Sequence, residues 1–262
     1  MTLPSLLNWE GTRAALHQVA LVLGALRVAC SDPLPNDLHF SLDLTAAGFS
    51  TTTLSCGAML EFNLNTLRLN LTRSKKIVFA LDVHGHSQIS LAEKLRTAFA
   101  DCPCSIAPSM KHITGSETLA IDPALAVDCL IAFNALYTAL ARFRAKLNGF
   151  MTPLVLWPHH FDTAFICFPT EQTNERSDPQ IAFGFAPFSP GLERPYIYAY
   201  AWSQPAGYLE LPLDPPALAL TESYTGLYAA YDDLREAQDF NSVIESMLLH
   251  YHRAAVAKLA QL

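Results

Sequence analysis

The sequence predicts an α+β fold, with mostly antiparallel sheet packed by about four helices. Three observations lead to this prediction. Hydrophobic residues make up 51% of the 262 residues and charged residues only 16%, which is enough apolar material for a sizeable core. Apolar residues recur at helical spacing in some segments and alternate with polar residues in others. Helical and strand patterns follow one another in blocks, as in α+β folds, and not in the strict alternation of a parallel sheet.

The first half of the chain begins with a helical pattern and continues with strands. Apolar residues at helical spacing predict a helix over about residues 10–29. Ser90 and Glu93 have the spacing of a capping box, which predicts a short helix that starts there and reaches about residue 100. Between the two helices, alternation predicts strands over residues 39–45, 60–64, 67–72 and 77–83, the second and third of which form a hairpin.

The second half begins with the clearest helix signal in the chain. Asp122 precedes Pro123, which is the preferred order of N-cap and first helical residue, and an apolar stripe follows to about Leu147. Residues 154–168 are apolar on both alternating faces, which is typical of a central strand, and Pro158 predicts a bend within it. The remaining predicted elements are strands over residues 181–185 and 196–202, irregular chain over 203–220 and a helix over 244–259.

Length and charge restrict the organisation and the partners. We expect one domain over residues 1–262, within which the pattern allows two loose halves, 1–120 and 121–262. The formal charge of -7 excludes a basic nucleic-acid-binding domain, because phosphate neutralisation needs a dense cationic surface. Polar residues interrupt the apolar stretches, so we expect neither a signal peptide nor a membrane span. A soluble, cytoplasmic protein is therefore expected.

Polar residues stand against the apolar pattern most densely at residues 157–162, which read Trp-Pro-His-His-Phe-Asp. In a strand, His160 and Asp162 share a face, whereas His159 points to the other face unless Pro158 bends the chain. An imidazole beside a carboxylate can act as a general base, so His160 and Asp162 are candidate catalytic residues. The same pair can bind a divalent metal, which is the one cofactor that the sequence suggests. The alternative is that the two side chains satisfy each other in the core.

This segment resembles an uncharacterised bacterial family, domain of unknown function 5996. The run Trp157 to Ala164 carries the resemblance, together with the motifs at residues 183–185, 189–191 and 195–200. In the first half, His17, Gly24, Arg27, the segment His39 to Thr45, Gly48 and Thr51 also match, so the resemblance covers nearly the whole chain. The sequence departs from the family's pattern at Leu21, Ala25 and Ala47. The family implies no reaction.

Two further groups of residues are candidate ligand-binding groups. His17, Gly24 and Arg27 share one face of the first predicted helix, and they could line a cleft against the polar strand face that carries His39 and Asp43. His159 is a further candidate ligand-binding residue. Convergence of His17, His39, His160 and Asp162 would suit a divalent metal or acid–base chemistry, whereas the alternative for the helix and strand faces is simple solvation. The predicted strand at 196–202 places Tyr196, Tyr198, Tyr200 and Trp202 on one face, either as core or as the wall of a pocket.

Three functions remain open from the sequence. The first is a soluble protein that binds a small molecule at a site formed by the tyrosines, His160 and Asp162. The second is a metal-assisted, hydrolase-like enzyme that uses His160 and Asp162. The third is an interaction protein without a small-molecule site, and a homo-oligomer is compatible with each of the three.

Overall fold

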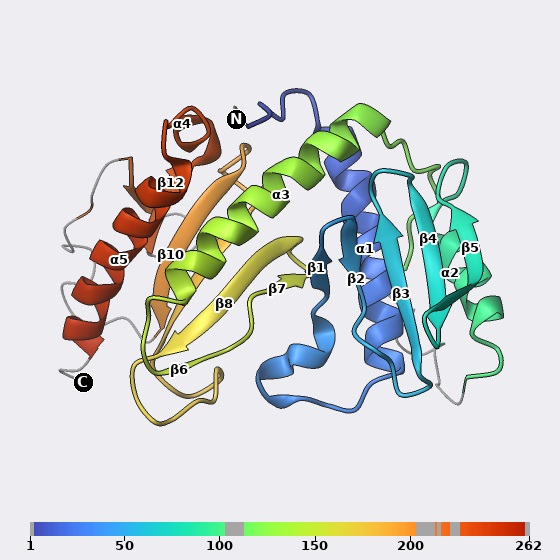
Figure 1. Ribbon diagram of the computed structural model, residues 1–262, viewed down its shortest axis with the longest axis horizontal. Helices are drawn as coiled ribbons and strands as arrows, with labels where there is room; N and C mark the ends of the chain where they lie inside the picture. The colour runs from blue at the N-terminus through green and yellow to red at the C-terminus, as the bar shows by residue number, and fades with distance from the viewer. Residues whose placement is uncertain (1–2, 103–112, 203–212, 214–215, 221–225, 260–262) are drawn as a thin grey trace. The chain divides into compact units, whose positions relative to one another are not determined.

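The computed structural model of the chain has two antiparallel sheets with helices packed against them (Figure 1), which confirms the α+β class. The structure describes residues 3–102, 113–202, 213, 216–220 and 226–259. The chain divides into two compact units. We call Leu6–Asn134 with Leu156–Phe161 the N-terminal unit, and Met1–Ser5 with Ala135–Val155 and Asp162–Leu262 the C-terminal unit. The prediction of a single domain concerns cooperative folding and stays a prediction.

The N-terminal unit contains a five-stranded sheet in the order β1-β2-β3-β4-β5, in which each pair is antiparallel. The predicted hairpin is confirmed, since Leu60 pairs with Leu71 and Phe62 with Leu69. Two helices, α1 (Glu10–Ala29) and α2 (Gln88–Ala98), lie behind this sheet in the view of Figure 1. The strands are β1 (Asp43–Thr45), β2 (Gly48–Ser50), β3 (Ala58–Asn63), β4 (Arg68–Arg73) and β5 (Lys76–Asp82).

The core of this unit follows directly from the two periodicities. Along β3, Leu60 and Phe62 are buried while the residues between them are half-buried, as expected for a strand with one face on the core. On α1 the apolar stripe is fully buried, so helix and sheet cover each other's apolar face. The stripe consists of Leu16, Val19, Leu23 and Leu26.

The C-terminal unit contains a sheet in the order β11-β12-β10-β9-β8-β6. Its central strands β8, β9 and β10 are buried on both faces, as expected for strands in the middle of a sheet. The strands are β6 (Phe150–Met151), β8 (Asp162–Phe168), β9 (Gln180–Ala186), β10 (Tyr196–Trp202), β11 (Leu218–Leu220) and β12 (Gly226–Ala230). The short helix α4 (Tyr231–Leu234) leads to α5 (Phe240–Leu259), and α5 contacts β10.

The long helix α3 (Pro123–Arg144) passes from one unit to the other. Its start is as predicted, because Asp122 Oδ1 accepts hydrogen bonds from the backbone amides of Ala124 and Leu125 at 2.8 and 3.1 Å. By length and composition alone this helix could cross a membrane, but a core helix passes the same test. Leu136, Leu140 and Phe143 on this helix are buried, whereas Ile131 is exposed.

Several predicted elements were wrong in part. The predicted strand at 39–45 begins only at Asp43, because Asn36 and Asp37 adopt left-handed conformations and form the 3-10 segment η1 (Pro35–Phe40). Helix α2 is capped by Ser87, whose side chain accepts from the Ser90 amide, and not by Ser90 itself. Within the predicted irregular segment 203–220, residues 218–220 form β11, while 203–212 and 214–215 lie outside the described residues.

The predicted strand 154–168 is interrupted at its proline. It consists of β7 (Val155–Trp157), a turn and β8, and the boundary between the two units falls in β7 and again after Phe161. Pro158 has no amide to donate, so the ladder ends there. The alternation that placed His160 and Asp162 on one face of a strand therefore does not apply.

Candidate functional site

Within the N-terminal unit, the turn after β7 is held against α1. His17 Nε2 donates a hydrogen bond to the carbonyl oxygen of Pro158 at 2.7 Å. About two helical turns further along, Gly24 leaves room for the proline ring, since a Cβ at this position would lie only 2.8 Å from Pro158 Cγ. His17 and Gly24 therefore bind the turn by a polar contact and by close packing.

Phe161 fixes the end of the same turn. Its φ of 56° is in the left-handed region, which costs energy for a residue with a side chain. The ring compensates by being buried: it stacks on His17 with ring centroids 5.4 Å apart and contacts Phe49 and Phe133 at 6.1 and 5.6 Å. The strained backbone is thus held by the aromatic packing of the N-terminal unit.

The imidazoles of His159 and His160 are exposed on this turn, with ring centroids 4.2 Å apart. The surrounding protein and the neighbouring imidazoles of His160 and His17 lower the pKa of His159 to about 4. Burial lowers the pKa of His17 as well, against the opposing effect of its bond to Pro158. At neutral pH both rings are uncharged.

Two other predicted residues have separate environments. Arg27 is buried on α1, and its guanidinium donates to the backbone carbonyl and the hydroxyl of Ser41, the latter at 3.2 Å. Burial lowers the pKa of Arg27. The half-buried His39 lies in η1, where its Nδ1 accepts from the Leu34 amide at 3.2 Å and its ring contacts Phe40. The structure thus joins His17 to the turn that carries His159 and His160, and gives Arg27 and His39 other partners.

Within the C-terminal unit, Asp162 belongs to a buried hydrogen bond with the aromatic strand. The Tyr198 hydroxyl donates to Asp162 Oδ2 at 2.5 Å across the intervening strand β9. Gly184 on β9 makes this reach possible, because a Cβ there would lie 2.5 Å from Tyr198 Cζ and from its hydroxyl oxygen. The tyrosine ring therefore passes close over the glycine, and the hydrogen bond depends on the absence of a side chain at this position.

The tyrosines of β10 form a continuous row. The rings of Tyr196, Tyr198 and Tyr200 follow one another at 6.1 and 6.0 Å, as predicted for residues two apart on one face. Tyr196 shares a hydrogen bond of 2.7 Å with the hydroxyl of Ser189. Burial raises the pKa of Tyr200, and Asp162 and Glu175 add to the effect. The hydroxyl groups of Tyr196 and Tyr198 thus have hydrogen-bond partners, which buried tyrosines require.

A metal site at His160 and Asp162 would need further ligands, and the described part of the chain does not supply them. No group of three or more His, Cys, Asp or Glu side chains among those residues could hold a metal ion. Asp162 is buried at the start of β8, and His160 is exposed in the turn before it.

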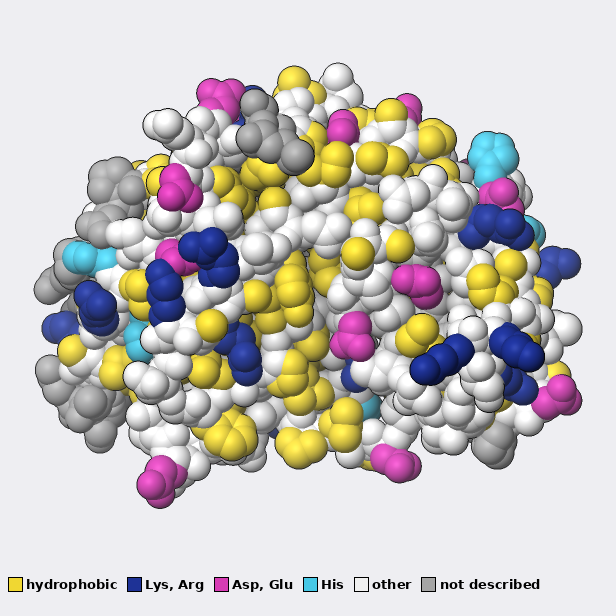
Figure 2. Space-filling view, in the orientation of Figure 1, with side chains coloured by type: hydrophobic (Ala, Val, Ile, Leu, Met, Phe, Trp, Pro, Cys, Tyr) yellow, Lys and Arg dark blue, Asp and Glu magenta, His cyan; other side chains and the backbone are white. Residues whose placement is uncertain are grey.

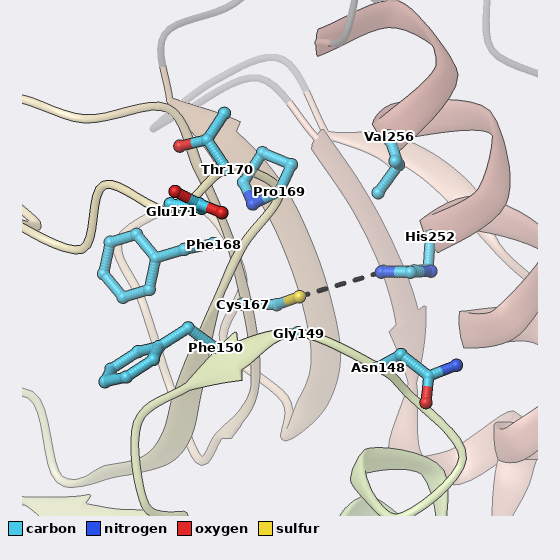
Figure 3. Close-up of a pocket in the computed structure, with 10 residues that line it drawn as sticks. All are labelled: Asn148, Gly149, Phe150, Cys167, Phe168, Pro169, Thr170, Glu171, His252 and Val256. Carbon is cyan, nitrogen blue, oxygen red and sulfur yellow. Dashed lines mark hydrogen bonds between the residues drawn. The ribbon is translucent and has the colours of Figure 1, made fainter.

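A pocket of about 510 Å³ opens in the C-terminal unit, beside α5 (Figure 3). Figure 3 shows the Cys167 thiol on β8 and the His252 imidazole on α5 pointing toward each other, with Sγ and Nε2 3.7 Å apart. The Phe150 and Phe168 rings lie side by side and point away from His252. The pocket is lined by Asn148, Gly149, Phe150, Cys167, Phe168, Pro169, Thr170, Glu171, His252 and Val256.

The Cys167–His252 pair is uncharged at neutral pH. Burial raises the pKa of the Cys167 thiol to about 11, although Arg144 opposes the effect, and burial lowers the pKa of His252. The proton therefore stays on sulfur, and the pair offers a thiol and a neutral imidazole to a ligand. A thiolate nucleophile would need a depressed pKa instead.

Sequence reasoning missed this pocket. Cys167 was one apolar residue in an apolar strand, and His252 lies 85 residues further along the chain. No spacing motif links them, so the signal exists only in the folded chain. The polar residues at 157–162, which stand out in the sequence, instead form the turn that packs against α1.

Comparisons with known proteins place the whole chain in one family. Neither a curated protein nor a solved structure matches it. The sequence model of the family of unknown function DUF5996 matches residues 3–262, so the chain belongs to this family.

Proposed function

We propose that this protein binds a small organic molecule in the pocket beside α5. The volume of about 510 Å³ carries the proposal, because ligand pockets typically measure roughly 300–1,000 Å³. The walls combine apolar surface with a few polar groups, which is the usual composition of such sites. Val256 and Pro169 supply apolar surface, while His252 and Asn148 supply hydrogen-bonding groups.

The lining also favours one class of ligand. Glu171 is the only charged residue among those that line the pocket, since His252 is neutral at pH 7. A carboxylate beside an apolar wall attracts a cation and repels an anion. The ligand is therefore a molecule with an apolar body and a cationic or hydrogen-bond-donating group, such as an arylalkylamine.

The test uses two probes of the same shape and opposite charge. Binding of 2-phenylethylamine and of phenylacetate is measured by shifts of backbone amide signals in NMR titrations. We expect the amine to bind, and to shift signals of residues 167–171 and 252–256, while phenylacetate binds at least about tenfold more weakly.

Matched variants on the same helix assign the site. Val256→Phe fills the pocket and should weaken binding of the amine by about tenfold or more. Val243→Phe makes the same substitution on α5 at a residue that does not line the pocket, and should leave binding unchanged. The proposal is wrong if both variants bind as the wild type does, or if the two probes bind equally.

A further inference from the structure

A second pocket, of about 360 Å³, opens on a different face of α5. His250 lines this pocket and His252 lines the first, and residues two apart on a helix point about 200° apart. The lining is polar. Lys146 lies just after the end of α3, and the other lining residues belong to α5. The lining consists of Lys146, Ser242, Glu245, Ser246, Leu249, His250 and Arg253.

The one carboxylate in this pocket is already used. Glu245 is 3% exposed, and its two oxygens accept from Arg142 Nε and Lys146 Nζ. The hydrogen bonds from Lys146 and Arg142 lower the pKa of Glu245, so it stays ionised. A buried carboxylate that is paired in this way adds little acceptor capacity for a further ligand.

The other polar groups can all donate hydrogen bonds. Lys146 has three N–H groups, of which Glu245 takes one, and Arg253 forms no ion pair with any residue that the structure describes. The Ser246 hydroxyl adds one more donor, whereas the Ser242 side chain is already hydrogen-bonded to Asp239. A cavity that is rich in free donors and poor in free acceptors is complementary to an anion.

Local charge agrees with this reading. The cations Arg142, Lys146 and Arg253 outnumber the carboxylates Glu245 and the exposed Asp239, although the chain as a whole carries a formal charge of -7. Figure 2 shows Lys and Arg side chains gathered over α5 and the end of α3. This part of the C-terminal unit therefore carries a local excess of positive charge.

We infer that the pocket formed by Lys146, Arg253 and Ser246 binds a small molecule that carries a phosphate group. Arg253 provides a planar pair of donors that matches two phosphate oxygens, and the Lys146 ammonium contributes a second positive charge. The volume exceeds that of a phosphate ion, so part of the cavity accommodates the rest of the molecule.

Isothermal titration with inorganic pyrophosphate at constant ionic strength tests this inference. We expect binding by the full chain, and a loss of affinity of about tenfold or more in Arg253→Gln. Lys258→Gln removes a positive charge from the same helix outside the pocket, and should leave the affinity unchanged. Both substitutions are at surface positions, and a thermal melt of each variant verifies that it is folded.

Three results would overturn the inference. These are the absence of heat at millimolar pyrophosphate, equal affinity in the wild type and Arg253→Gln, and equal losses in Arg253→Gln and Lys258→Gln. The last result would show attraction to a basic surface without a site. A phosphomonoester that binds more tightly than pyrophosphate would support an organic phosphate as the ligand, and one that does not bind would contradict it.

Discussion

Gly184 is the residue on which the geometry of the aromatic strand depends most directly. A Cβ at this position would lie 2.5 Å from the Tyr198 ring and 2.8 Å from the backbone oxygen of Thr163. Gly184→Ala should therefore destabilise the protein by about 1–3 kcal/mol, since the clash involves backbone as well as a buried ring. The measurement is the free energy of unfolding in urea. Gly11→Ala is the control, because nothing lies within 4 Å of its Cβ and α1 should gain about 0.5–1 kcal/mol.

Cys167 should be unreactive in the folded protein. Its pKa of about 11 and its burial leave almost no accessible thiolate at pH 7.5. Iodoacetamide should alkylate the half-buried Cys56 first, and Cys167 only when urea unfolds the chain, as followed by mass spectrometry of peptides. Alkylation of Cys167 at the same rate as Cys56 in native protein would instead indicate a nucleophilic site.

At the scale of elements, the contact between α1 and the turn after β7 determines whether Gly24 tolerates a side chain. Alanine usually stabilises a helix interior by about 0.5–1 kcal/mol relative to glycine. Here the added Cβ would lie 2.8 Å from Pro158 Cγ and 3.0 Å from its Cβ, in a rigid ring. We expect overpacking of about 1–3 kcal/mol to outweigh the helical gain, so that Gly24→Ala lowers the urea midpoint. A raised midpoint would show that the turn is not held on α1.

The same turn makes stability depend on pH. The pKa of His159 is about 4 in the folded chain and 6.5 without the protein environment, so the unfolded chain binds more protons between these values. The contribution of this residue is thus fully present above pH 6.5 and declines as the pH falls toward 4. His159→Gln should reduce the difference between urea midpoints at pH 7 and pH 5. An NMR titration of the His159 ring with a midpoint near 6.5 would contradict this.

The sequence predicts elements better than it predicts contacts between them. The helix at 10–29, the hairpin of β3 and β4, and the strands β9 and β10 follow from local periodicity, and the structure confirms them. The prediction that a strand begins at His39 was wrong. Asn36 and Asp37 adopt left-handed conformations, and an alternation of polar and apolar residues does not reveal them. The pair Cys167 and His252 could not be predicted, because it depends on how β8 and α5 pack in three dimensions.

At the scale of the whole molecule, α3 is the element that both units share. Residues 123–134 of this helix belong to the N-terminal unit and residues 135–144 to the C-terminal unit. Unfolding either unit would expose half of a continuous apolar helix, which favours a single cooperative transition. We expect fluorescence of the buried Trp9, in a variant with Trp157→Phe and Trp202→Phe, to change at the same urea concentration as the far-ultraviolet circular dichroism. Two separate transitions would show two independent domains.

A crystal structure of the protein soaked with 2-phenylethylamine tests the ligand pocket most directly. If the amine binds in this pocket, we expect electron density for the phenyl ring beside Val256 and for the ammonium group within hydrogen-bond distance of the Glu171 carboxylate. Density at other sites alone, or an empty space between Cys167 and Val256 at a saturating concentration of the amine, would contradict a small-molecule site beside α5.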